Sequence, residues 1–204
     1  MSIVTNFDLS DSVVLRPVSI DDMSSVRYVH EIAFRILAAE HHSEEQLAAH
    51  IEVMRQPEYI KEIRNNSVYC AWVDGEIVGT SGWCPADDNG TTARIRKVFV
   101  RPLFSCCGIG RLLLENAEAR AYQAGFTDFS VRANVNAVSF YTRAGYEITS
   151  HGVMSTNSGI DLPVAFMRKK AQFTRPVLNN HTNGSLETIA HNGWWAQHTE
   201  HKGP

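Results

Sequence analysis

Two glycines, Gly108 and Gly110, are the residues whose type and spacing point most directly to chemistry. They follow a β-branched and aromatic run that ends at Val100-Arg-Pro102, and a Leu-rich amphipathic stretch begins directly after them. This order predicts a strand, a glycine loop and the N-terminus of a helix. Such a junction presents unpaired backbone N–H groups and the positive end of a helix dipole to one point. Because glycine has no Cβ, the backbone can approach a ligand closely, and the chemistry predicted is the binding of a phosphate group.

Cys106 and Cys107 stand just before the first glycine and allow two interpretations. A thiol near a helix N-terminus can have a lowered pKa and act as a nucleophile. The alternative is that two small side chains fit a tight loop. No histidine nearby in the sequence is placed as a partnered base, which favours the second interpretation.

Hydrophobic periodicity and turn residues predict the elements that position this loop. Strands are expected over 13–17, 68–73, 76–83, 93–100, 126–131, 146–153 and 162–168. Helices are expected from Ser19–Asp22 to Ala39, after the capping box Ser43-x-x-Gln46, after Pro57, from the glycine loop to Gly125, and over 134–144. Asp74-Gly75 predicts a hairpin turn. The strand–helix–strand unit around the glycine loop implies a parallel pair inside a mixed sheet, and therefore an α/β fold.

Composition restricts the function classes. With 204 residues, a net charge of −3 and no basic or long apolar run, the chain predicts one soluble cytoplasmic domain without nucleic-acid or membrane binding. The four cysteines lack paired spacing, so neither a metal site nor a disulfide framework is expected. We expect a domain over 1–170 and a polar tail over 171–204. The tail's Trp194-Trp195 pair lies in a flexible terminus or docks on this chain or a second copy, as in a homodimer.

A longer motif makes the glycine loop specific. The segment from Asn134 to Tyr146 fits N-x-x-A-x-x-[FL]-Y-x-x-x-G-[FY] at every fixed position. Together with Val100-x-Pro102 and Gly108-Ile-Gly110, it closely resembles the GNAT superfamily of acyl-CoA-dependent N-acyltransferases, and a bacterial subgroup of acetyltransferases within it. The matching residues span about 93–146, and the predicted strand order extends the match over roughly 13–170. The resemblance implies a GNAT-like fold, with a central mixed β-sheet of about seven strands flanked by about four helices.

The resemblance also implies acetyl-CoA as cosubstrate, with no metal. The loop amides from Cys107 to Arg111 are expected at the pyrophosphate, and the backbone of Phe99 and Val100 along the pantetheine arm. Asn134 is expected as a helix N-cap or as a polar contact to that arm. Ser105 stands where the family usually has Gln or Arg, so one side-chain contact is expected to be lost. The cofactor-binding residues implied are Val98, Phe99, Val100, Cys106, Cys107, Gly108, Ile109, Gly110, Arg111, Asn134, Ala137, Phe140 and Tyr141.

Tyr141 is the catalytic residue that the resemblance implies, as the acid that protonates the departing thiolate. A thiol with a pKa of about 8.5 beside a phenol with a pKa of about 10 makes that transfer feasible, and a hydrogen bond is the minimum contribution. The alternative is that Tyr141 packs in the core with Phe140.

The general base is not evident from the sequence. Many family members carry a Glu on the strand before V-x-P, whereas this chain has Arg94, Arg96 and Lys97 there. A base must come from another element or from water. The candidates are Glu31, His41, His42, Asp87, Asp88 and His151, while Glu40, Glu44 and Glu45 with the two aspartates predict an acidic rim that favours a cationic amine.

These observations predict an N-acetyltransferase that acts on a primary amine of a small molecule or peptide, by direct attack in a ternary complex. The missing acid and the unusual lead-in to the glycine loop leave open a second interpretation, an acyl-CoA-binding or sensing module with little transferase activity. Trp83 and Cys84 end the strand nearest the expected acceptor side, with core packing as the simpler role.

Overall fold

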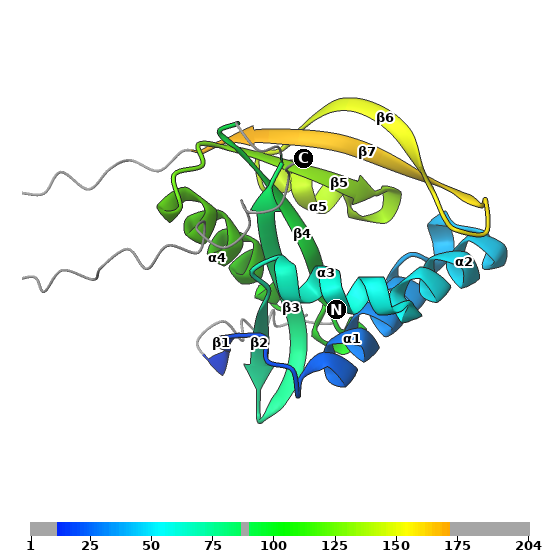
Figure 1. The fold of residues 1–204 in the computed structure, drawn as a ribbon, viewed down its shortest axis with the longest axis horizontal. Coiled ribbons are helices and arrows are strands. Elements are labelled where there is room, and N and C mark those ends of the chain that lie inside the picture. Colours follow the sequence, from blue (N-terminus) through cyan, green and yellow to red (C-terminus); the bar gives the residue numbers. More distant parts are fainter. Residues whose placement is uncertain (1–11, 87–89, 172–204) are drawn as a thin grey trace, which may run out of the picture. The chain divides into compact units, whose positions relative to one another are not determined.

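The structure is a computed structural model that describes residues 12–86 and 90–171. Figure 1 shows its strands and helices in chain order. The strands are β1 (Val14–Pro17), β2 (Tyr69–Val73), β3 (Glu76–Pro85), β4 (Thr92–Val100), β5 (Asp128–Asn134), β6 (Glu147–Ser155) and β7 (Asp161–Lys170). The α-helices are α1 (Met23–Leu37), α2 (Glu44–Arg55), α3 (Pro57–Asn65), α4 (Ile109–Gln123) and α5 (Val138–Arg143). Three single 3₁₀ turns are η2 (Ala39–His41), η3 (Pro102–Phe104) and η4 (Val135–Ala137).

The seven strands form one mixed sheet in the order β1-β2-β3-β4-β5-β7-β6. Neighbouring strands are antiparallel except β4 and β5, which run parallel and are joined through α4. The predicted parallel pair inside a mixed sheet is therefore confirmed. A parallel pair needs a crossover connection, and α4 supplies it directly behind the glycine loop.

Helices cover both faces of the sheet. Adjacent strand residues point to opposite faces, and β2 illustrates this. Cys70 packs into a core with side chains of α1, α2 and α3, whereas its neighbour Ala71 packs with Ile109 and Leu113 of α4. A third cluster joins α4 and α5 to β4, β5 and β7. The first three helices therefore lie on one face and α4 and α5 on the other.

Local signals in the sequence account for most element boundaries. Ser43 and Gln46 form the predicted capping box of α2, with both reciprocal hydrogen bonds present. Pro57 occupies the first turn of α3, where its missing N–H costs nothing. Asp74 and Gly75 have φ of 50° and 82°, the left-handed pair of a tight hairpin turn.

The described residues form five α-helices, and α3 is the helix predicted after Pro57. One boundary differs from the expectation. Strand β5 continues to Asn134, so the helix predicted over 134–144 begins as the 3₁₀ turn η4 and becomes α-helical only at Val138. Backbone pairing of Asn134 with Val164 of β7 explains the longer strand. The tail boundary at 170 stays a prediction, since 172–204, with Trp194-Trp195, lie outside the described residues.

Candidate functional site

The two parallel strands at the centre of the sheet separate and open a cleft. β4 and β5 pair only from Thr92 to Arg94 against Asp128 to Ser130, and they diverge beyond these residues. A cleft of about 550 Å³ lies at this opening, lined by both strands, the glycine loop, α5 and the end of α1. Because β5 diverges from β4, the β4 edge at Phe99 and Val100 pairs on that side with no strand of the described residues. That edge can pair with an extended ligand.

The glycine loop lies at one end of the cleft with its amides unpaired. Cys106 and Gly108 have φ of 63° and 81°, so the chain turns sharply before α4 begins at Ile109. Leu112 is the first residue of α4 whose N–H donates to a backbone carbonyl of the described residues, that of Gly108 at 3.1 Å. Within the described chain, the N–H groups of residues 106–111 donate to no backbone or side-chain acceptor. Six free amides at a helix N-terminus form a site suited to phosphate oxygens.

Most of the predicted cofactor-binding residues lie at the cleft. Those that line it are Val98, Phe99, Val100, Cys106, Gly108, Gly110, Arg111, Asn134, Ala137, Phe140 and Tyr141. Cys107 and Ile109 do not line it. Ile109 is fully buried against β2 and β3, and the thiol of Cys107 bonds back to Ser105 O at 3.5 Å. These two residues can therefore contribute only their backbone amides, and no described histidine hydrogen bonds to either loop cysteine.

Tyr141 packs in the core and also lines the cleft. Its ring packs edge-on against Phe140 and Tyr146, and 7% of the residue is exposed. The residue nevertheless lines the cleft, and its hydroxyl donates to no other described group. Burial, reinforced by the charge of Glu118, raises the pKa of Tyr141, so the phenol keeps its proton at neutral pH.

Asn134 and Arg111 take positions that differ from the simplest expectation. Asn134 occupies the N-cap position of η4, but its side chain makes no capping hydrogen bond and lines the cleft instead. Arg111 is mostly exposed and forms an ion pair at 2.7 Å with Glu115, one turn further along α4.

A β-bulge shapes the wall of the cleft. Thr80 pairs with Phe99 and Gly82 pairs with Arg96, so Lys97 and Val98 of β4 oppose the single residue between them on β3. Lys97 takes the extra position with φ of 56°, a rare conformation for a residue with a side chain. Bulges of this kind redirect side chains and backbone groups at functional sites.

The side chain of Lys97 is buried, with 7% of it exposed. Its Nζ lies 2.9 Å from Glu62 of α3 and 3.5 Å from the ring centre of Tyr59. Burial lowers the pKa of Lys97 to about 8, although Glu62 counteracts this effect. Glu62 also binds Arg96 at 2.9 Å. Partial burial raises the pKa of Glu62, but the hydrogen bond and charge of Lys97 outweigh it and the net pKa is lowered.

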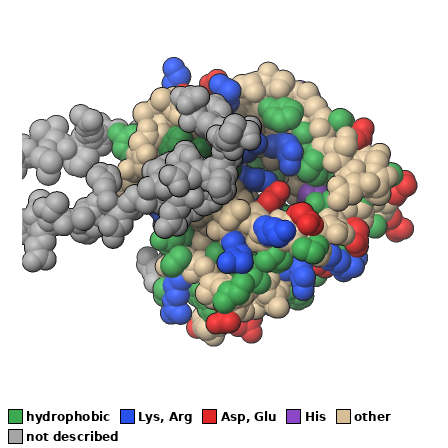
Figure 2. All heavy atoms as spheres, viewed as in Figure 1, with side chains coloured by type: hydrophobic (Ala, Val, Ile, Leu, Met, Phe, Trp, Pro, Cys, Tyr) green, Lys and Arg blue, Asp and Glu red, His purple; other side chains and the backbone are tan. Residues whose placement is uncertain are grey.

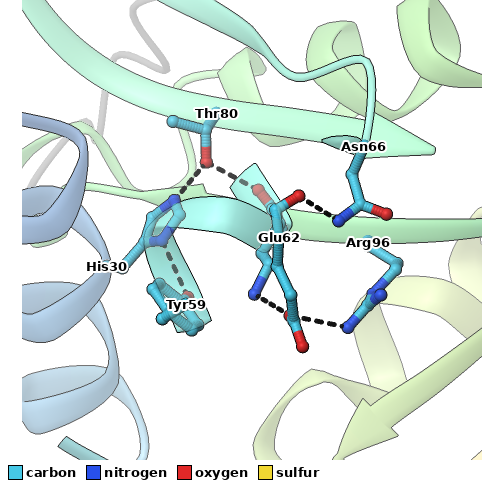
Figure 3. Close-up of polar contacts among 7 residues, drawn as sticks. His30, Tyr59, Glu62, Asn66, Thr80 and Arg96 are labelled. Carbon is cyan, nitrogen blue, oxygen red and sulfur yellow. Dashed lines mark hydrogen bonds and ion pairs between the residues drawn. The ribbon is translucent and has the colours of Figure 1, made fainter. Parts of the chain in front are cut away.

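A buried histidine connects α1 and α3 to the same bulge (Figure 3). Thr80 Oγ1 must donate to the carbonyl of Lys97, at 2.6 Å, because a carbonyl can only accept. Thr80 therefore accepts from His30 Nε2 at 2.7 Å, which leaves His30 Nδ1 to accept from the hydroxyl of Tyr59 at 2.8 Å. Burial and then the charge of Lys97 hold the pKa of His30 well below its ordinary value. A neutral imidazole therefore stabilises the bulge through Thr80, which binds the carbonyl of Lys97. The ring of His30 also stacks on Phe99, which lines the cleft.

The predicted bases lie elsewhere. Glu31 forms an ion pair with Arg55 at 3.0 Å, His41 and His151 are exposed, and none of these residues lines the cleft. His42 is buried beside Phe34 with both ring nitrogens unpaired. Asp87 and Asp88 lie outside the described residues. The acidic rim residues Glu40, Glu44 and Glu45 are exposed and do not line the cleft either.

Sequence reasoning missed Glu62 and His50, which the fold brings toward β4. His50 of α2 is 9% exposed and packs against Phe34, with its Nδ1 unpaired. Burial, followed by the charges of Lys97 and Arg132, lowers the pKa of His50 to about 4. Nothing local marks either residue, because α2 and α3 meet β4 only through the tertiary fold. Trp83, by contrast, packs against Phe126, consistent with the simpler core role.

The described residues form neither a metal site nor a membrane-spanning helix. No group of three or more His, Cys, Asp or Glu side chains within 12–86 and 90–171 is arranged to hold a metal ion. No helix in the same ranges has the length and apolar character that crossing a bilayer requires.

Comparison with known proteins agrees with this geometry. The family model described as "Acetyltransferase (GNAT) domain" matches residues 38–162. An uncharacterized N-acetyltransferase of Bacillus subtilis, YjcF, is 30% identical over 94 residues, which cover 46% of this chain and 65% of that protein. The alignment therefore spans slightly less than two thirds of this relative.

Solved structures share the fold. A GCN5-related N-acetyltransferase from Rhodopseudomonas palustris matches with a TM-score of 0.71 and 23% identity, covering 78% of this chain and 96% of that chain. PaiA N-acetyltransferase from Thermoplasma acidophilum, solved in complex with coenzyme A, matches with a TM-score of 0.63 and 21% identity, covering 78% and 99%.

Proposed function

Because this chain belongs to the GNAT acetyltransferase family, we propose that it transfers an acetyl group from acetyl-CoA to an amine, by direct attack in a ternary complex. The observation that carries this proposal is the run of unpaired amides in the glycine loop, at one end of a cleft between diverging strands. The fold shared with the Thermoplasma enzyme, whose structure contains coenzyme A, supports the same donor.

The donor is placed by backbone groups. The pyrophosphate accepts hydrogen bonds from the amides of residues 106–111, and the pantetheine arm extends along the free edge of β4 at Phe99 and Val100. Ser105 in place of a longer side chain leaves this arrangement intact, because the donors are main-chain N–H groups. The thioester then lies farther into the cleft, toward the bulge at Lys97.

Tyr141 assists the leaving group. When the amine attacks the thioester carbonyl, the C–S bond breaks and negative charge develops on sulfur. The phenol of Tyr141 is neutral because its pKa is raised, and it donates a hydrogen bond to that sulfur. It then gives its proton to the thiolate and regains one from solvent after the products leave.

The amine must lose a proton before it attacks, which costs roughly 4–5 kcal/mol at pH 7 for an alkyl amine with a pKa near 10.4. Glu62 does not itself line the cleft, but it forms ion pairs with Arg96 and Lys97, which do, and 45% of its side chain is exposed. We assign to Glu62 the passage of this proton to solvent. Its lowered pKa suits a relay through water better than storage of the proton.

A charge placed at the phosphate site tests the proposal. Gly110 lines the cleft beside Phe140 and Val100, so Gly110→Glu puts a carboxylate where the pyrophosphate binds. We expect isothermal titration to show coenzyme A binding at least about 10-fold weaker, a loss of about 1.4 kcal/mol or more. The matched control is Leu103→Glu, which adds the same charge at a residue of the same loop that is 86% exposed.

Three outcomes separate the alternatives. Absence of coenzyme A binding by the unmodified protein contradicts the proposal. Equal binding by the unmodified protein and Gly110→Glu contradicts the assigned phosphate site. Tight binding without thiol release across a broad amine panel favours the acyl-CoA-sensing alternative.

A further inference from the structure

We propose that the acceptor amine also carries an oxyanion, a carboxylate or a phosphate, and that three arginines of β4, β5 and β7 bind it. The proposal rests on the acetyltransferase function above. It reverses the expectation of a cationic acceptor that the acidic residues of the sequence suggested. The site is a second cavity of about 370 Å³ lined by Arg94, Arg132, Arg168, Ser130, Thr149 and Ser150.

The sheet register brings these arginines together from three strands. Arg94 of β4 pairs with Ser130 of β5, and Ser130 pairs with Arg168 of β7, so the three residues form one row across the sheet. Arg132 lies two residues beyond Ser130 and therefore projects on the same face. The neighbouring residues Ala93, Phe129 and Met167 point the other way, into the core under α4 and α5. The arginine row thus lies on the face that carries α1, α2 and α3.

The charge of this cluster is not balanced by the described chain. Arg96, the next β4 residue on this face, has a carboxylate partner, Glu62, which it shares with Lys97. No carboxylate of 12–86 or 90–171 forms an ion pair with Arg94, Arg132 or Arg168. This includes Glu147, although it pairs with Arg168 in the β6–β7 register.

Mutual repulsion is evident at Arg132. Partial burial lowers the pKa of Arg132, the charges of Arg96 and Arg94 lower it further, and Glu62 only partly offsets them. Planar guanidinium groups that converge without carboxylates fit the oxygens of a carboxylate or phosphate, which they bind by paired hydrogen bonds. An oxyanion in this cavity would relieve the repulsion. Figure 2 shows a hollow near the centre of the view where Lys and Arg side chains lie, with Asp and Glu side chains and a histidine beside them.

The arginine cavity adjoins the cofactor cleft. Arg132 lines both this cavity and the cofactor cleft, while Arg96 lines the cleft. Arg96 and Arg132 lie where β4 and β5 begin to diverge, directly beyond the last paired residues, Arg94 and Ser130. An acceptor anchored by its oxyanion on Arg94 and Arg168 would extend its amine past Arg132 into the cleft, toward the thioester. The cluster would then set both the affinity and the direction of the acceptor.

Matched acceptor pairs test this assignment by turnover. Tyrosine and tyramine differ by a carboxylate, and phosphoethanolamine and ethanolamine differ by a phosphate. We expect kcat/KM in a thiol-release assay to be at least about 10-fold higher for the anionic member of at least one pair. The pair that responds distinguishes a carboxylate from a phosphate. Arg168→Gln should raise KM for that member about 10-fold while leaving KM for its neutral counterpart unchanged.

Control variants separate a specific contact from a general charge effect. Arg35→Gln removes the same charge from an exposed residue of α1, and it should change neither KM. Arg168→Lys keeps the charge but loses the paired hydrogen bonds, so it should fall between the unmodified protein and Arg168→Gln. Equal use of both members of each pair, or loss of the preference in Arg35→Gln, overturns the proposal while the acetyltransferase function stands.

A binding measurement covers the case in which none of these amines is acetylated. The coenzyme A complex is titrated calorimetrically with the same four compounds and with inorganic phosphate. We expect the anionic member of at least one pair to bind at least about 10-fold more tightly, with Arg94→Gln and Arg168→Gln each weakening that binding. Failure of every anion to bind more tightly than its neutral counterpart overturns the oxyanion site, even when coenzyme A itself binds.

Discussion

At the scale of single residues, burial decides which protonation states are available for chemistry. Tyr141 is held neutral and His50 is held uncharged, because the surrounding protein disfavours the charged form of each. The same burial lowers the pKa of Lys97 to about 8, so this ammonium is less firmly protonated than a surface lysine. Tyr141 and Lys97, which line the cleft, are therefore a neutral hydrogen-bond donor and a weakened ammonium.

Replacement of Tyr141 by Phe removes only the hydroxyl. Because the ring is packed against Phe140 and Tyr146, the variant should keep its fold and its affinity for coenzyme A. We expect kcat to fall about 100-fold, the usual effect of losing a proton donor at a leaving group. Thiol release with a saturating acceptor measures this. Unchanged kcat would show that Tyr141 serves packing alone.

At the scale of elements, a buried carboxylate joins α4 to the C-terminal strands. Glu118 of α4 is 3% exposed and accepts hydrogen bonds from the hydroxyl of Tyr146, at 2.9 Å, and from Nζ of Lys169 on β7, at 2.7 Å. The ring of Tyr146 also contacts Tyr141. Helix α4, which follows the glycine loop, is thereby tied to β7 and, through Tyr146, to Tyr141 of α5.

Loss of this carboxylate should destabilise the protein. Glu118→Ala leaves the ammonium of Lys169, 18% exposed, and the hydroxyl of Tyr146 without their partner. We expect the free energy of unfolding to fall by about 3–5 kcal/mol in urea denaturation. Glu115→Ala is the control, because Glu115 forms an exposed ion pair on the same helix and should cost less than about 0.5 kcal/mol. Similar effects of the two variants would contradict the role assigned to Glu118.

At the scale of the whole molecule, the packing of α1 and α2 on the sheet makes stability depend on pH. His50 has a folded pKa of about 4, lowered first by burial and then by the charges of Lys97, Arg132 and His42. In the unfolded chain its pKa returns to about 6.5. Between these values the unfolded state binds more protons, so stability falls as the pH drops from about 6.5 toward 4 and is constant below.

The expected size of this effect is measurable. Lowering the pH from 7 to 5 should cost about 2 kcal/mol through His50 alone. The slope of unfolding free energy against pH in that window should decrease in His50→Phe, which cannot be protonated. His151→Phe, at an exposed position of β6, should leave the slope unchanged. An unaltered slope in His50→Phe would contradict the assignment.

The sequence alone determined the order of elements, the glycine loop and most of the residues that line the cleft. Each depends on local signals: the capping box at Ser43, the left-handed pair Asp74-Gly75, and the motif from Asn134 to Tyr146. A phosphate site built from consecutive main-chain amides lies in one short segment, so spacing along the chain is enough to predict it.

Only the tertiary structure brought together the residues on which the proposed acceptor site depends. Glu62 and His50 reach β4 from separate helices, and Arg94, Arg132 and Arg168 meet because three strands pair in one register. In the sequence these arginines are spread over three strands, and the acidic residues of 40–45 suggested the opposite charge. The burial, the pKa and the charge balance of these side chains depend on residues that are distant along the chain. Only the folded sheet brings those residues into contact.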